Sequence, residues 1–129
     1  MDIVVLSLAI SAGIHAALAP EHFREWLPAG LGFVVATVLL AALAIQLTYR
    51  PTDLALLATC VVFVGLIVSY ALVVANGIPL LHPEQESVDG LALFTKAVEA
   101  LGAGLALTLV RRPSLALSMS LSQPKGTFE

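Results

Sequence analysis

Residues 54–74 read LALLATCVVFVGLIVSYALVV, without a charged side chain. A helix rises about 1.5 Å per residue, so a helix over this stretch is long enough to cross the roughly 30 Å hydrocarbon core of a bilayer. Asn76, Gly77 and Pro79 follow it, and residues of these types commonly end a helix. The stretch therefore predicts a membrane-spanning helix.

Three more stretches are long and mainly apolar, at about residues 3–19, 30–49 and 91–110. Hydrophobic residues make up 59% of the 129-residue chain and charged residues only 12%, about half the charged share found in soluble domains. No stretch alternates polar and apolar residues for long enough to predict a membrane β-barrel. The sequence predicts an all-α membrane protein, a four-helix transmembrane bundle within residues 1–112, inserted in the plasma (inner) membrane.

The basic residues predict how this bundle is oriented. Four of the six lie between the second and third spans, at Arg50, and after the fourth span, at Arg111, Arg112 and Lys125, whereas the loops on the opposite side carry Arg24 alone. Under the positive-inside rule these segments are cytoplasmic, and with them both termini. Residues 113–129 contain two prolines, a glycine and several hydroxyl side chains, which predicts a flexible cytoplasmic tail.

Composition excludes several classes of protein. The net charge is -3 and there are six Lys and Arg residues in total, which excludes a nucleic-acid binder that works by neutralising phosphates. Cys60 is the single cysteine, so a disulfide scaffold is excluded as well. No serine lies in a nucleophile context such as G-x-S-x-G, and a membrane enzyme is therefore the least supported class.

Two charged residues lie within the fourth predicted span. Lys96 and Glu99 are three residues apart, so they are neighbours on one helix face and can pair. A charge at the bilayer centre costs roughly 2.5 to 3.5 kcal/mol on insertion scales, and Glu99 is therefore predicted to face the bundle interior. One interpretation is a structural pair that fixes how this span docks. The other is that Glu99 handles a proton or a cation.

Further polar residues are predicted to lie near this pair. His15 lies about 6 Å below the outer end of the first span, at the level of Tyr70 in the third span. With Glu99 these residues predict a cavity in the outer half of the bundle. A polar face of the first span leads to it, if the helix continues through Pro20. Its residues are spaced by three and four, at Ser7, Ser11, His15, Leu18 and His22.

The outer face also carries imidazole and carboxylate side chains of the kind that bind zinc, copper or iron. The candidate metal ligands are His15, His22, Glu25 and His82. Their spacing matches no specific metal signature. In the alternative interpretation, residues 20–26 (PEHFREW) form an amphipathic interfacial linker that aromatic side chains anchor at the membrane surface.

Small residues predict which spans touch. They recur four apart in the first and the fourth span, at Ala9, Gly13 and Ala17 and at Ala100, Gly102, Gly104 and Ala106. Such residues allow two helix backbones to approach closely, so these two spans are predicted to be in contact. A four-span chain has little interior of its own. We therefore expect a homo-oligomer or a subunit of a larger membrane complex.

Several of these residues occur together in a known family. They are His15, the run PEHFREW at 20–26, Gly77-Ile78-Pro79 and Thr95-Lys96-x-x-Glu99. With them the chain resembles an uncharacterised actinobacterial family of small four-transmembrane proteins with a PEHFxEW motif. The resemblance covers most of residues 10–110. It implies the four-span fold and the importance of the outer-half residues, and it implies no particular reaction.

The sequence leaves two classes of function open. In the first, the chain is a small integral membrane accessory or binding protein, whose outer-face cluster of His and carboxylate side chains binds a metal ion, such as copper or zinc, or docks a partner in a membrane complex. In the second, the chain is a small oligomeric transporter that uses Glu99 as its proton or cation carrier.

Overall fold

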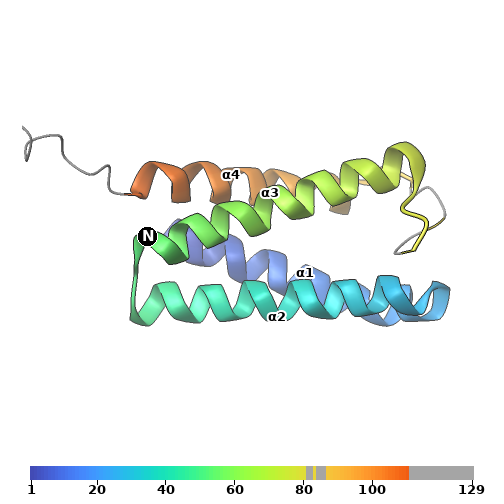
Figure 1. Ribbon diagram of the computed structural model, residues 1–129, viewed down its shortest axis with the longest axis horizontal. Helices are drawn as coiled ribbons and strands as arrows, with labels where there is room; N and C mark the ends of the chain where they lie inside the picture. Colours follow the sequence, from blue (N-terminus) through green and yellow to red (C-terminus); the bar gives the residue numbers. More distant parts are fainter. Residues whose placement is uncertain (81–82, 84–86, 111–129) are drawn as a thin grey trace, which may run out of the picture.

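The computed structural model describes residues 1–80, 83 and 87–110, and these residues form an all-helical bundle (Figure 1). Its four helices are α1 (Asp2–Glu25), α2 (Leu27–Tyr49), α3 (Asp53–Asn76) and α4 (Gly90–Leu109). Each of them is long and apolar enough to cross a membrane. The fold is therefore the predicted four-helix bundle with candidate transmembrane helices. The predicted tail at 113–129 and the candidate ligand His82 lie outside the described residues.

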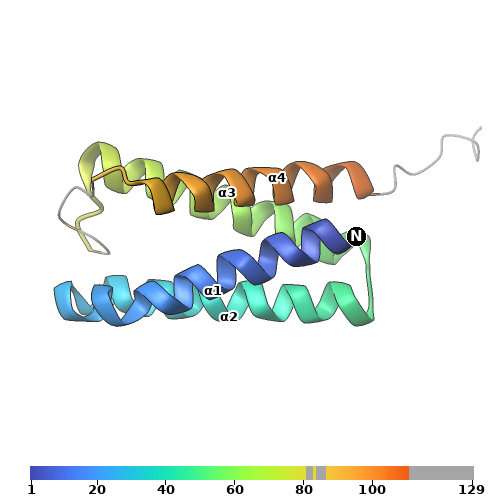
Figure 2. The same cartoon turned by 180° about the vertical axis from the view of Figure 1, so that it is seen from behind.

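The helices alternate in direction around the bundle. α1 packs against α2 and α4, and α3 packs against α4 and α2, whereas the diagonal pairs of these helices are not in contact. Met1, the connection between α2 and α3, and the end of α4 lie at one end of the molecule, which we call the terminal end (Figures 1 and 2). The turn at Trp26 and residues 77–80 and 87–89 lie at the opposite end, the loop end. That the terminal end is cytoplasmic remains a prediction.

Local sequence explains where the helices begin and end. The side chains of Thr52 and Asp89 cap α3 and α4 by accepting hydrogen bonds from the backbone N–H groups of Ala55 and Ala92, at 3.2 and 2.7 Å. Gly77 ends α3 with φ 67° and ψ 167°, a conformation that is almost confined to glycine. Both capping residues are short polar side chains that compete poorly inside helices and well at their ends.

The first span is longer than its sequence predicted. It was expected to stop at residue 19, but α1 continues through Pro20 to Glu25. Proline removes one backbone donor, but its fixed φ is compatible with a helix, so the lost hydrogen bond affects a single turn. The next turns keep their backbone hydrogen bonds, such as Trp26 N–H to His22 O at 2.8 Å. Trp26 alone is extended between α1 and α2. The second helix therefore begins at Leu27, before its predicted start at about residue 30.

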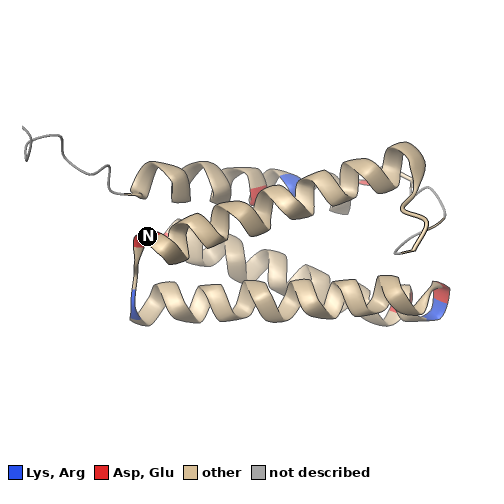
Figure 3. Cartoon of the chain, in the orientation of Figure 1, with Lys and Arg blue, Asp and Glu red and all other residues tan. Residues whose placement is uncertain are grey.

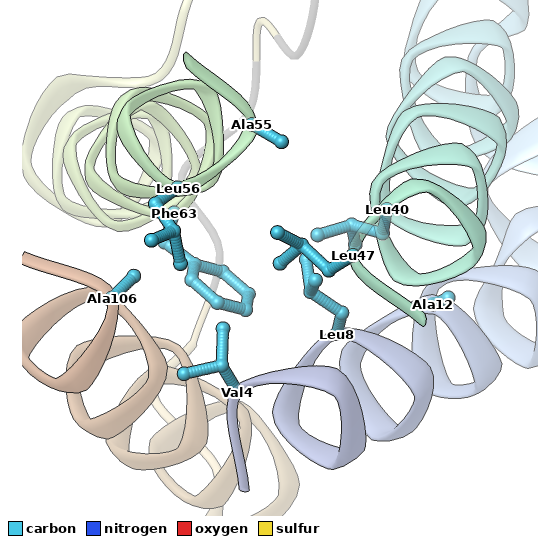
Figure 4. Close-up of a cluster of buried hydrophobic side chains, with 9 residues drawn as sticks. All are labelled: Val4, Leu8, Ala12, Leu40, Leu47, Ala55, Leu56, Phe63 and Ala106. Carbon is cyan, nitrogen blue, oxygen red and sulfur yellow. The ribbon is translucent and has the colours of Figure 1, made fainter. Parts of the chain in front are cut away.

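A compact apolar core lies in the terminal half and middle of the bundle (Figure 4). Phe63 and Leu40 are fully buried in it, and the complete cluster is Val4, Leu8, Ala12, Leu40, Leu47, Ala55, Leu56, Phe63 and Ala106. Many leucine and valine side chains of all four helices are exposed on the outer surface. The outer and core-facing sides are therefore both apolar, and an apolar outer surface is what hydrocarbon would require of a spanning bundle.

The predicted contact between α1 and α4 is confirmed, but of the small residues expected to form it only Gly102 and Ala106, both on α4, are buried. Gly102 is buried, and a Cβ placed on it would lie 2.9 Å from Ser7 Cβ and would overlap the Phe63 ring. On α1, Ala9, Gly13 and Ala17 are exposed, so the small-residue stripe of this span points away from α4. The side of α1 that meets α4 carries Ser7 and Ser11 instead. Ser11 Oγ donates to Glu99 on α4, whereas Ser7 Oγ donates to Ile3 O within α1.

Candidate functional site

Two charged side chains lie inside the helical segments away from the helix ends, both on α4 (Figure 3). Glu99 is completely buried, as its position in the bilayer predicted. Ser11 Oγ donates a hydrogen bond to its Oε1 at 2.8 Å, and Lys96 Nζ donates one to its Oε2 at 2.7 Å. Each carboxylate oxygen therefore has a donor, and a charge-assisted bond of this kind is about twice as strong as a neutral one.

Lys96 is less buried than Glu99, with 17% of its side chain exposed. Its ammonium group also lies 3.4 Å from the backbone oxygen of Leu66 and 5.5 Å from the centre of the Tyr70 ring, both on α3. A cation over an aromatic ring is stabilised by the negative face of the ring. Lys96 thus links α4 to α3, and Glu99 links α4 to α1.

The two described histidines lie on the same face of α1 and meet one phenylalanine. His15 Nδ1 lies 2.8 Å from Ser11 O, and His22 Nδ1 lies 3.0 Å from Leu18 O. Each Nδ1 is the donor in its bond, since a carbonyl oxygen only accepts. The ring of Phe33 on α2 stacks on His22 at 3.8 Å between centroids and lies tilted against His15 at 5.3 Å.

A cavity of about 230 Å³ lies beside these residues in the loop half of the bundle, between all four helices. Its polar lining residues are His15, Ser69, Tyr70, Thr95 and Lys96. Most of its other lining residues are apolar, among them Ile14, Phe33, Ala36, Leu66, Val73 and Ala92. The sequence predicted that His15, Tyr70 and Glu99 would share a cavity. His15 and Tyr70 line it, but Glu99 does not.

The cavity wall carries a positive charge, and the matching negative charge lies behind it. Lys96 lines the cavity, whereas Glu99 does not. Because the ion pair is 2.7 Å long, the two charges cancel at longer range, and the ammonium group is the part of the pair nearest to any occupant. The arrangement presents a hydrogen-bond donor to the cavity at little net charge.

The metal candidates are not gathered into one site. In the described part of the chain, no three His, Cys, Asp or Glu side chains come close enough together to hold a metal ion. Phe33 contacts both His15 and His22, and Glu25 is exposed. Imidazole rings that pack on an aromatic ring and donate to the backbone have a structural role that needs no metal.

The segment that follows α3 contributes to the loop end of the cavity. Ile78, next to Gly77, is among the lining residues. Trp26 Nε1 donates a hydrogen bond to the backbone oxygen of Leu80 at 3.3 Å. The turn between α1 and α2 is thereby tied to the segment after α3, across the end of the bundle where the cavity lies.

Sequence reasoning did not single out two lining residues, Phe33 and Ser69. A phenylalanine within an apolar span carries no signal of its own, because hydropathy gives every side of α2 the same weight. Ser69 had a usable signal, since Leu66, Ser69 and Val73 are spaced by three and four and so share a helix face.

Comparisons with known proteins add no assignment to this site. No protein-family model, no curated protein and no solved structure matches the chain.

Proposed function

We propose that this chain is a small multi-pass membrane binding protein that holds a ligand in the cavity of its loop half. The observation that carries the proposal is the cavity itself, about 230 Å³ between all four helices, with a small polar group of residues on a largely apolar wall. Ligand sites in proteins have this construction, in which apolar walls supply affinity and a few polar groups fix orientation.

The polar network supports this proposal. A bundle that needed only stability would close the space, since each void loses dispersion contacts along its lining. It would also have no need for Lys96, whose charge is costly in a spanning helix. Glu99 and its bond from Ser11 hold the ammonium group beside the cavity, so we assign Glu99 the role of a positioning residue and Lys96 the contact with the ligand.

Two other expectations from the sequence, a metal ion as the ligand and docking to a membrane partner, have less support than this proposal. A metal ion as the ligand has no support from the described residues, because they gather no three ligating side chains. Docking to a membrane partner, or assembly with further copies of the chain, is compatible with the exposed apolar surface. That surface suits lipid equally well, so it favours no partner over the bilayer.

The proposal is tested by filling the cavity and measuring what the purified protein carries. Ala92 lines the cavity on α4, and Ala97 on the same helix is exposed. We expect small molecules extracted from protein in mild detergent to include a species that is retained by wild type and Ala97→Leu and depleted in Ala92→Leu. Mass spectrometry of the extracts measures this. Identical profiles in all three samples would contradict the proposal.

A transporter that is coupled to protons or cations through Glu99 is the second candidate. The observation in its favour is a completely buried carboxylate near the middle of a candidate spanning helix. Against it, Lys96 neutralises that carboxylate and lies between it and the cavity. If Glu99 is a carrier, vesicles with wild-type protein show proton-coupled flux and Glu99→Gln abolishes it without disturbing assembly. The binding proposal expects no such flux from wild type.

A further inference from the structure

We infer that the cavity takes the ring of an uncharged amphiphile that bears a carbonyl oxygen, with this oxygen accepting a hydrogen bond from Lys96 Nζ. The inference rests on the proposed function and names the chemical class of its ligand. Three properties of the cavity lead to it: its volume, its charge and the shape of its walls.

The volume selects a single ring. An engineered apolar cavity of about 150 Å³ is known to bind benzene, and this cavity measures about 230 Å³. It is therefore large enough for one substituted six-membered ring. It lies below the roughly 300 to 1,000 Å³ of pockets that enclose a drug-sized molecule, so a longer tail on the ligand would extend out of it.

The charge selects an uncharged hydrogen-bond acceptor. Lys96 Nζ has three N–H groups, and Glu99 Oε2 and Leu66 O are its two oxygen partners. One donor remains for an occupant. Because Glu99 already neutralises the ammonium group, an anionic ligand would leave a net negative charge in a medium of low dielectric constant, which is strongly unfavourable. A carbonyl oxygen accepts the bond without that cost.

The walls select a flat ring. Phe33 and Tyr70 line the cavity from α2 and α3, and His15 lines it from α1. Aromatic side chains pack best against a flat π system in offset-stacked or edge-to-face arrangements. The remaining wall is mostly aliphatic, which suits ring substituents and excludes a strongly hydrated group.

The bilayer gives such a molecule a route to the site. α2 and α3 make the smallest contact of the four adjacent helix pairs, and they diverge towards the loop end in Figure 1. Gly32 and Phe33 on α2 and Leu66 and Val73 on α3 are all lining residues. An amphiphile dissolved in the hydrocarbon can therefore approach between these two helices.

Three probes of one shape test the inference. Duroquinone carries two carbonyl groups on a tetramethylated ring, durene has the same four methyl groups and no polar atom, and 2,3,5,6-tetramethylbenzoate adds a negative charge. Binding is measured by equilibrium dialysis of the full chain in detergent against matched empty micelles. We expect duroquinone to bind wild type about tenfold more tightly than durene or the benzoate, as one charge-assisted hydrogen bond would give.

Variants connect this preference to the proposed contact. In the double variant Lys96→Met/Glu99→Gln, which leaves no unpaired charge, we expect the preference for duroquinone over durene to vanish while durene still binds. Retained durene binding also shows that the variant is folded. Ala92→Leu should weaken every probe, and Ala97→Leu none. If the double variant fails to fold, the order of the three probes on wild type decides by itself.

The possible failures are distinguishable. Equal or tighter binding of durene or of the benzoate by wild type, abolished by Ala92→Leu, would overturn the carbonyl inference and leave the binding function standing. A preference for duroquinone that persists in the double variant would overturn the role of Lys96. Binding of no probe by wild type above the micelle control would overturn the inference, and the small-molecule extracts would then decide the binding function separately.

Discussion

Ser11 on α1 donates a hydrogen bond to Glu99 on α4, with 2.8 Å between Oγ and Oε1. Both side chains are completely buried. The bond therefore joins the first and the last helix of the bundle at a depth where water offers no replacement partner. It also fixes the carboxylate that in turn holds Lys96 at the cavity wall.

Removing this donor should destabilise the bundle. We expect Ser11→Ala to lower the free energy of unfolding by about 1.5 kcal/mol, within the range for hydrogen bonds to charged groups and between membrane helices. Ser7→Ala is the control, since Ser7 Oγ donates to Ile3 O within α1 and its loss should cost less. Unfolding titrations in mixed micelles measure both. An equal loss for the two variants would show that the Ser11 bond adds nothing between the helices.

Replacing one member of the Lys96–Glu99 ion pair should lower stability more than replacing both members. Lys96→Met leaves Glu99 buried without its cation, and we expect a loss of about 3 to 5 kcal/mol, as for other buried pairs that lose one member. Lys96→Met/Glu99→Gln removes both charges and should recover most of that loss. Thermal unfolding of the two variants and of wild type measures the difference. Additive effects of the two substitutions would contradict the pairing.

Two glycines of α4 should respond to alanine in opposite directions. At Gly102 a Cβ would overlap the Phe63 ring, whereas at Gly104 it meets nothing within 4 Å. Overpacking costs about 1 to 3 kcal/mol, and alanine in an open helical position gains about 1 kcal/mol. We therefore expect Gly102→Ala to lower stability and Gly104→Ala to leave it unchanged or raise it. A neutral Gly102→Ala would refute the close packing of α4 against Phe63 on α3 and Ser7 on α1.

The predicted orientation can be read with single cysteines. Pro51 and Val88 are exposed near opposite ends of the bundle, and Cys60→Ser removes the native thiol. With both termini cytoplasmic, we expect Val88→Cys to react with a membrane-impermeant maleimide in intact cells, and Pro51→Cys to react only after permeabilisation. Labelling in the reverse pattern would place the loop end in the cytosol.

Much of this architecture could be predicted from the sequence, because few arrangements of a polypeptide chain are stable in a bilayer. Long apolar stretches located all four helices. The cost of a buried charge placed Glu99 in the interior, and a spacing of three residues paired it with Lys96. The same apolar character explains why the sequence did not predict which side of each helix faces the interior. α1, α2 and α3 are apolar on nearly every side, so hydropathy could not say that Ala9 and Gly13 face outward, or that Phe33 faces the histidines.

Pro20 shows a different limit of sequence reasoning. Proline inside a helix removes one hydrogen bond, and this local cost predicted an end for the first span. The helix nevertheless continues to Glu25, since the following turns bury His22 against Phe33 and keep their own bonds. A tertiary contact outweighed a local preference, and no single-sequence pattern reports such contacts.

The position of the apolar core makes the two ends of the molecule differ in how tightly their helices pack. Around Phe63 all four helices are locked together by close packing, whereas at the other end the two helical hairpins enclose open space and are bridged by the bond from Trp26 to Leu80. The two helical hairpins, α1–α2 and α3–α4, pack closely near the chain ends and lie further apart at the loop end (Figure 1). A change in the distance between the two hairpins at the loop end would move Trp26 relative to Leu80. The fluorescence of Trp26 would then report that change.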